Sequence, residues 1–357
     1  MTHLFTPIRL RSVEIRNRVW VAPMCQYSAV DGVPNDWHLV HLGSFARGGA
    51  GLVMTEASAV SPEGRISPVD AGIWNDEQAD AWSRITAFVK GQGATAGMQL
   101  AHAGRKASTR PPFEGRGPVT VEEGGWETVG PSAMPFPGLP SPRELSIAGI
   151  DEVVEEFVHA ARRALGAGFE VLEIHAAHGY LLHEFLSPLS NNRQDEYGGS
   201  FDNRVRLLLR VVRALRDAVP ESTPLLVRIS ATDWVEGGWT LDDSVTLGGL
   251  LRENGVDLVD VSSGGNAPAD VQVGAGYQVP FARRIRNEAG IPTGAVGLIT
   301  DPKQAEEILA DNAADVVLLA RAMLRDPHWA LQAAHALGVP VGDGVDWPRQ
   351  YLRASLD

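Results

Sequence analysis

The stretch Gly168-Phe-Glu-Val-Leu-Glu-Ile-His-Ala-Ala-His-Gly-Tyr-Leu-Leu-His-Glu-Phe-Leu186 decides how the whole chain is interpreted. It opens with an apolar run that predicts a short buried strand and consists of Phe169, Val171, Leu172 and Ile174. His175, His178 and Tyr180 follow where that strand ends. Ligands of parallel α/β folds bind at this end of the strands, so the stretch predicts a functional site there.

The two histidines and the tyrosine allow more than one interpretation. Imidazole donates a hydrogen bond to a carbonyl or binds a metal, and a phenol releases a proton. A histidine at a strand end is also often a satisfied structural residue. Metal binding is disfavoured, because no carboxylate or thiolate stands at ligand spacing and His183-Glu184 lacks the second histidine of a His-Glu-x-x-His motif. We therefore predict no metal site.

Strands and helices alternate along most of the 357 residues. The predicted strands are residues 17–22, 51–56, 95–100, 169–174, 225–229, 257–261, 293–296 and 315–319. Between them the apolar spacing predicts helices at 76–91, 151–167, 201–218, 241–254 and 302–311, with weaker patterns at 38–48 and 327–337. Asp151 and Asp301 are the predicted N-caps of two of these helices.

This alternation predicts an α/β fold, a single-domain (β/α)8 TIM barrel over residues 1–357. The length also fits two domains of ~150 residues. A doubly wound open sheet is the other candidate architecture, but its Gly-x-Gly-x-x-Gly fingerprint follows none of the strands.

Three segments fall outside the repeat. Residues 4–18 are expected to cap the bottom of the barrel. The Pro- and Gly-rich segment 105–146 after strand three is too long for a plain connection, so we expect a lid over the active face. Residues 343–357 form a C-terminal tail.

Composition excludes several classes of partner. The net charge of -13 argues against nucleic acid and anionic membranes, although local arginines could still hold an anionic cofactor. The single cysteine, Cys25, excludes an intrachain disulfide. No secretory signal and no apolar run of membrane-spanning length are visible, so we expect a cytoplasmic protein.

Polar residues collect at the predicted strand ends. Gly297 and Ala320-Arg321 follow strands seven and eight, where these barrels commonly bind phosphate. Gly297 could instead serve only a turn, and Arg321 could pair with Asp326. Arg228 lies inside a strand, which requires an anionic partner, either a structural ion pair or a cofactor.

Several of these stretches resemble the old yellow enzyme family of flavin-dependent ene-reductases, in particular its bacterial thermophilic-like branch. The matching motifs are Pro23-Met24-Cys25-Gln26-Tyr27, Gln99-Leu-Ala-His102-Ala-Gly-Arg105-Lys106, His175-Ala-Ala-His178-Gly-Tyr180, Phe185-Leu-Ser-Pro-Leu-Ser-Asn191, Asp195-Glu-Tyr-Gly-Gly199 and Asn203-Arg204. Two departures are Ala22, often Ser in the family, and Ala320, often Gly.

The resemblance implies a barrel that binds FMN, is reduced by NADPH or NADH, and then reduces the C=C bond of an α,β-unsaturated carbonyl compound in the same pocket. It implies that His175 and His178 hold the substrate carbonyl, that Tyr180 protonates Cα, that Cys25 tunes the flavin and that Tyr27 contacts substrate. The residues implied to hold FMN are Pro23, Met24, Cys25, Ala57, Gln99, Arg228, Gly297, Ala320 and Arg321.

The resemblance also implies an assembly. Gln350-Tyr351-Leu-Arg353 resembles a motif whose arginine enters the neighbouring subunit's active site, so we expect a homodimer or tetramer in which Arg353 contacts substrate. A dienoyl-CoA reductase-like flavoprotein is an alternative, although one cysteine cannot ligate an iron–sulfur cluster. A flavin-based redox sensor that uses Cys25 is another.

Overall fold

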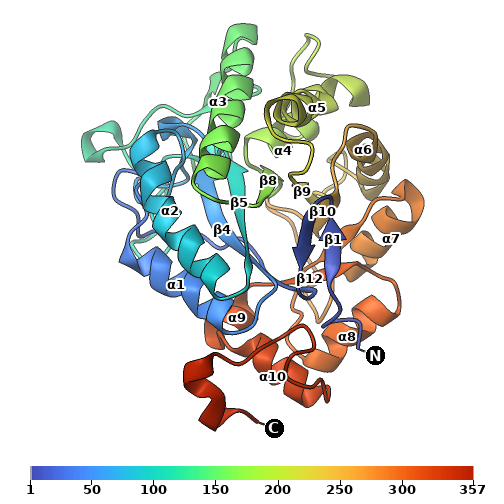
Figure 1. The fold of residues 1–357 in the computed structure, drawn as a ribbon. Helices are drawn as coiled ribbons and strands as arrows, with labels where there is room; N and C mark the ends of the chain where they lie inside the picture. Colours follow the sequence, from blue (N-terminus) through green and yellow to red (C-terminus); the bar gives the residue numbers. More distant parts are fainter. Residues whose placement is uncertain (1, 357) are drawn as a thin grey trace.

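The computed structural model describes residues 2–356 as a closed barrel of eight parallel strands (Figure 1). Met1 and Asp357, the ends of the predicted domain and tail, lie outside the described residues. In chain order the barrel strands are β3 (Val19–Val21), β4 (Leu52–Ala59), β5 (Thr95–Ala101), β8 (Val171–Ala176), β9 (Leu225–Ser230), β10 (Leu258–Ser262), β11 (Thr293–Ala295) and β12 (Val316–Leu319). The predicted TIM barrel is confirmed, and the open-sheet alternative is wrong because β12 pairs with β3.

Alternation along the strands explains why these segments form a barrel. Leu52 and Met54 of β4 belong to one buried apolar cluster, whereas Val53 between them belongs to another. The first cluster also contains Trp20, Val171 and Leu258 from other strands and fills the barrel interior. The second includes the apolar faces of the surrounding helices, so each strand is buried on both faces.

A ring of helices surrounds the strands (Figure 1). These are α1 (Asp36–Arg47), α2 (Asp76–Gly91), α3 (Ile147–Gly166), α5 (Phe201–Ala218), α6 (Leu241–Glu253), α7 (Val279–Ala289), α8 (Pro302–Ala310) and α10 (Trp329–Ala336). Two short helices, α4 (Leu181–Leu186) and α9 (Arg321–Arg325), follow β8 and β12.

One prediction about the helices is wrong, and one helix was not predicted. The N-cap of α3 is Ser146, whose side chain accepts the Gly149 N–H, and Asp151 lies inside the helix. Helix α7 was not predicted, because only Ala282, Ile285 and Ala289 are buried and no side chain caps its N-terminus. The predicted Asp301 cap is confirmed by its bonds from the Lys303 and Gln304 amides.

The three extra segments have their own structure. An antiparallel hairpin, β1 (Ile8–Leu10) with β2 (Val13–Ile15), packs Leu10 and Ile15 onto the interior cluster. The segment 105–146 leaves the barrel after β5 and contains the short pair β6 (Val129–Gly130) and β7 (Arg143–Glu144). The tail carries the 3-10 helix η4 (Arg349–Ala354). No helix within residues 2–356 is long and apolar enough to cross a membrane.

Candidate active site

The turn after β8 brings together His175, His178 and Tyr180. The His175 ring centroid lies 5.2 Å from that of His178 and 5.0 Å from that of Tyr180, both edge-on. His178 has a φ of 60°, a left-handed conformation that is uncommon outside glycine. A non-glycine residue in this conformation persists only where the surrounding structure holds it. The contacts around His178 therefore determine where the side chains of His178 and Tyr180 point.

Three neighbouring elements fix His178. Its N–H donates to the Ser230 hydroxyl at the end of β9 at 2.9 Å. Its Nε2 lies 2.7 Å from the Ser262 hydroxyl at the end of β10. Its carbonyl accepts a 2.7 Å hydrogen bond from Lys106 Nζ, at the start of the 105–146 segment. The imidazole is therefore immobilised before any ligand binds.

Both imidazoles are neutral hydrogen-bond donors. His175 Nδ1 accepts the Ala177 N–H at 3.2 Å, so the proton of the neutral ring lies on Nε2. Burial, and then the nearby Arg228 charge, lower the pKa of His175 and of His178 well below the ordinary value. Each neutral ring therefore carries one N–H group. In His178 that group is free for a ligand, on Nδ1, when the Ser262 hydroxyl donates to Nε2.

Tyr180 retains its phenolic proton. Burial raises the pKa of Tyr180 well above its ordinary value. Lys106 Nζ lies 5.0 Å from the Tyr180 ring centroid, and burial lowers the pKa of Lys106 to about 8. A protonated phenol beside two neutral imidazoles can supply a proton to a ligand that the imidazoles hold.

Cys25 and Tyr27 lie on the loop after β3. The Gln26 N–H between them donates to Glu56 Oε2 at 3.0 Å, and Glu56 Oε1 lies 3.0 Å from His38 Nε2. Burial and the carboxylates of Asp70 and Glu56 raise the pKa of the Cys25 thiol well above its ordinary value. Burial, and then Cys25, also raise the pKa of Tyr27. Both groups keep their protons.

A cavity of about 500 Å³ lies between Tyr27, Tyr180 and the 105–146 segment. Its lining includes Tyr27, Lys106, Phe136 and Tyr180. Phe113 of the segment packs edge-on against Tyr27 with the ring centroids 6.1 Å apart. Trp126 lies elsewhere, with the Arg65 guanidinium 4.8 Å from its ring centroid. Segment 105–146 therefore forms a wall of the cavity.

A polar layer crosses the barrel interior at the level of Gln99. Gln99 Nε2 donates to Glu173 Oε1 at 2.8 Å. Arg228 Nε lies 3.2 Å from Asp260 Oδ2, which is the ion pair that a buried arginine requires. Arg228 also lines a second cavity, beyond the ends of β11 and β12. Its guanidinium therefore faces both the Asp260 carboxylate and any group bound in that cavity.

A second cavity, of about 150 Å³, lies beyond the ends of β11 and β12. Its lining residues include Ala22, Arg228, Gly297, Ala320, Arg321 and Arg325. Three guanidiniums around one small cavity, in a chain of net charge -13, fit the phosphate of a nucleotide cofactor. Asp326 accepts the His328 N–H, and no ion pair with Arg321 occurs among the described residues.

The remaining predicted residues fall into two groups. Pro23 and Met24 precede Cys25 on the loop after β3, and Ala57 lies in the neighbouring strand β4. Arg353 is exposed in η4, where Tyr351 accepts a 2.7 Å bond from Arg47 at the last turn of α1. Within one chain the structure does not bring Arg353 to the other site residues.

Several site residues were not predicted as such from the sequence. They are Lys106, Phe113, Phe136, Ser230, Ser262 and Arg325. Lys106 is part of a quoted motif, but its contacts with the β8 and β10 loops arise only from the fold.

Glu184 of α4 contacts the backbone at Arg105, where the 105–146 segment begins, and its buried carboxyl predicts a pH-dependent stability. Burial raises the pKa of Glu184 to about 8, although Arg105 opposes the shift and its amide donates to Oε1 at 2.8 Å. The folded state therefore holds a proton that the unfolded chain releases near pH ~4.3, and stability falls as pH rises towards 8. We expect Glu184→Gln to gain stability over the unmodified protein by up to about 1.4 kcal/mol per pH unit across that interval.

Urea midpoints measured from pH 5 to pH 9 check this expectation. Glu155→Gln, at an exposed position of α3, is the matched control and should show a constant difference. A Glu184→Gln difference that does not vary with pH would contradict the expected protonation state.

The barrel, the polar layer and the arginine-lined cavity together fit a flavin-dependent oxidoreductase. A model of the NADH:flavin oxidoreductase / NADH oxidase family matches residues 3–339, and the chain belongs to that family. It is an enzyme that uses FMN together with NADPH or NADH.

Individual relatives agree with this assignment. The NADPH dehydrogenase of Geobacillus sp. (strain WCH70) is 48% identical over 351 residues, 98% of each chain. The NADPH dehydrogenase of Listeria innocua is 46% identical over 99% of each. Morphinone reductase superposes with a TM-score of 0.80 at 29% identity, over 95% of this chain and 90% of that chain. The old yellow enzyme homologue of Zymomonas mobilis gives 0.77 at 26% identity over 97% of each.

Proposed function

We propose that this enzyme reduces the activated C=C bond of α,β-unsaturated carbonyl compounds. The observation that carries the proposal is the convergence of His175, His178 and Tyr180 on one turn, of which Tyr180 lines the cavity of about 500 Å³. Burial lowers the pKa of both imidazoles and raises the pKa of the phenol, which favours neutral rings and a protonated phenol. Two N–H donors and one acid suit a substrate whose oxygen gains negative charge while a neighbouring carbon is protonated.

In this function His175 and His178 donate hydrogen bonds to the carbonyl oxygen. Because both rings are fixed by protein contacts before substrate binds, their dipoles need no reorganisation as charge develops on that oxygen. Tyr180 delivers its proton to Cα, and Tyr27 contacts the substrate from the opposite loop. Bound FMN would supply hydride chemistry at Cβ, with NADPH or NADH as the reductant.

Of the residues proposed to hold FMN, one group contacts the flavin ring and another binds the phosphate. Gln99 and Arg228 present an amide and a guanidinium from the polar layer, and Pro23, Met24, Cys25 and Ala57 complete that side. Gly297, Ala320 and Arg321 line the arginine-rich cavity and hold the phosphate. A buried Arg228 whose partner is a single carboxylate retains donors for a cofactor.

Cys25 acts on the flavin rather than as a redox sensor. A sensor needs a thiolate, and the surroundings of Cys25 favour the neutral thiol. A neutral thiol offers a weak hydrogen-bond donor whose strength tunes a neighbouring ring.

We further propose a cytoplasmic homodimer or tetramer in which Arg353 contacts substrate in the neighbouring subunit. Its exposure on η4, away from the site of its own chain, supports a role in a second copy.

An anaerobic titration of the purified protein tests the reaction class. We expect the visible flavin absorption to bleach when NADPH is added and to return when cyclohexenone follows. Flavin that bleaches but is not reoxidised would retain the family assignment and exclude enones as substrates.

A further inference from the structure

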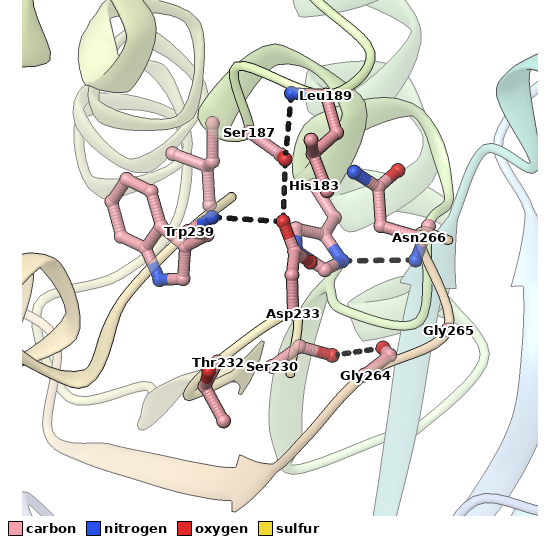
Figure 2. Close-up of polar contacts among 12 residues, drawn as sticks. His183, Ser187, Leu189, Ser230, Thr232, Asp233, Trp239, Gly264, Gly265 and Asn266 are labelled. Atoms are coloured by element: carbon pink, nitrogen blue, oxygen red, sulfur yellow. Dashed lines mark hydrogen bonds and ion pairs between the residues drawn. The ribbon is translucent and has the colours of Figure 1, made fainter. Parts of the chain in front are cut away.

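A buried histidine–carboxylate pair lies directly behind the catalytic turn. His183 belongs to α4, Asp233 belongs to the loop after β9, and neither side chain is exposed to solvent. His183 Nε2 lies 3.1 Å from Asp233 Oδ1 (Figure 2). Two polar side chains buried this completely require a reason to be there, because removing them from water is costly.

The proton on His183 has one possible position. Its Nδ1 accepts the backbone N–H of Gly179 at 2.9 Å, and a nitrogen that accepts an N–H carries no proton. The proton of the neutral ring is therefore on Nε2, on the side of Asp233. The bond to Gly179 depends on this tautomer.

Asp233 is held so that it selects that tautomer. Its Oδ2 accepts hydrogen bonds from the Ser187 hydroxyl and, at 2.9 Å, from the Trp239 N–H (Figure 2). Burial alone would raise the pKa of Asp233, but the contacts with His183, Ser187 and Trp239 bring that pKa below its ordinary value. Oδ1 is left facing His183 Nε2 at 3.1 Å, as an ion-pair contact and not an aligned hydrogen bond.

Gly179 is the residue between His178 and Tyr180. Its φ is 72°, and a Cβ there would lie 2.3 Å from the Gly265 carbonyl oxygen on the loop after β10. The Gly179 peptide is thus clamped between the backbone of that loop and the imidazole of His183. Any rotation of this peptide changes the direction of the side chains on either side of it.

We propose that Asp233 and His183 are positioning residues that hold the Gly179 peptide through a single His183 tautomer and thereby aim His178 and Tyr180 at the substrate. The proposal rests on the function proposed above for these two side chains. Neither Asp233 nor His183 touches the substrate.

Asp233→Asn tests the tautomer directly. The Trp239 N–H requires an oxygen at the Oδ2 position, so the new amide nitrogen must take the Oδ1 position and point its N–H at His183 Nε2. Nε2 then becomes an acceptor, the ring proton moves to Nδ1, and two N–H groups face each other at Gly179. An isosteric change far from the substrate would disrupt the turn.

We expect two effects of Asp233→Asn in the FMN-loaded enzyme. The affinity for p-hydroxybenzaldehyde, measured from the flavin spectrum, should fall on the order of 10- to 100-fold, because the donors on the turn are displaced. The amide hydrogen of Gly179 should exchange faster with deuterium. Ser187→Ala is the matched control, since it removes one bond from the same carboxylate without changing the His183 proton, and it should alter neither quantity.

Equal losses of affinity in Asp233→Asn and Ser187→Ala, or unchanged affinity and exchange in Asp233→Asn, would overturn the proposal. If Asp233→Asn does not fold, His183→Asn and His183→Leu replace it. The asparagine keeps an acceptor opposite Gly179, so it should bind the phenol more tightly than the leucine variant, and equal affinities would also overturn the proposal.

A separate experiment distinguishes failure of the proposed function from failure of this positioning role. If replacing His175 and His178 themselves leaves phenol binding intact, the proposed function is wrong whatever Asp233→Asn does. If the His175 and His178 replacements weaken phenol binding but Asp233→Asn and the His183 variants bind the phenol normally, only the positioning role is wrong.

Discussion

Replacing His175 and His178 together by alanine should slow cyclohexenone reduction by on the order of 100- to 1,000-fold, the usual cost of removing donors from a developing oxyanion. Phenol binding should weaken in parallel, because the proposed function has a phenolate oxygen accept hydrogen bonds from the same two imidazoles. FMN should remain bound, since the residues proposed to hold it lie in the polar layer and the arginine-lined cavity. Turnover, phenol titration and flavin content measure the three quantities.

The left-handed backbone of His178 calls for a control in this experiment. Alanine at a φ of 60° adds backbone strain to the loss of the donor. His178→Asn tolerates that conformation and retains an N–H donor, so it should keep more activity than His178→Ala. Unchanged turnover in the double alanine variant would exclude the carbonyl-binding role.

Tyr180→Phe should slow only the second half of the catalytic cycle. Removing a general acid costs on the order of 100- to 10,000-fold, so the return of flavin colour on adding cyclohexenone should slow by that factor. Bleaching by NADPH should keep its rate, since hydride transfer to the flavin needs no proton from this phenol. Anaerobic stopped-flow absorption separates the two steps.

Tyr197→Phe is the matched control for this substitution. Tyr197 is also buried and its hydroxyl contacts Arg210, but it lies outside the cavity. Both half-reactions should be normal in that variant. An equal loss of both rates in Tyr180→Phe would indicate damage to the pocket rather than loss of an acid.

The barrel could be predicted from the sequence because its strands are short apolar runs that end at Gly or polar residues. Helix α7 escaped prediction because its buried face is small and five of its eleven residues are charged or Asn. The start of α3 was misplaced because Gly149 interrupts its first turn, whereas burial of Ile150 extends the helix back to Ser146.

In the candidate site, too, residues within one sequence motif could be predicted, whereas residues joined only by tertiary contacts could not. His175, His178 and Tyr180 share one turn, so a single motif indicated them. Lys106 bonds the carbonyls of His178 and Gly265, which lie 72 and 159 positions away along the chain. Asp233 meets His183 only after β8 and β9 have paired. Contacts of this kind arise from tertiary structure and leave no local pattern.

The residues that line the cavity of about 500 Å³ come from two parts of the chain, and this affects how the substrate range can be changed. Tyr27 and the proposed acid Tyr180 come from the barrel rim, whereas most of the cavity wall, including Phe136, comes from the segment 105–146. Mutagenesis or exchange of that segment beyond its anchor at Lys106 would reshape the space around the substrate and leave the reacting groups in place. Under the proposed function, selectivity and chemistry are therefore separately evolvable, and we expect a library confined to residues 109–139 to change substrate preference without removing activity.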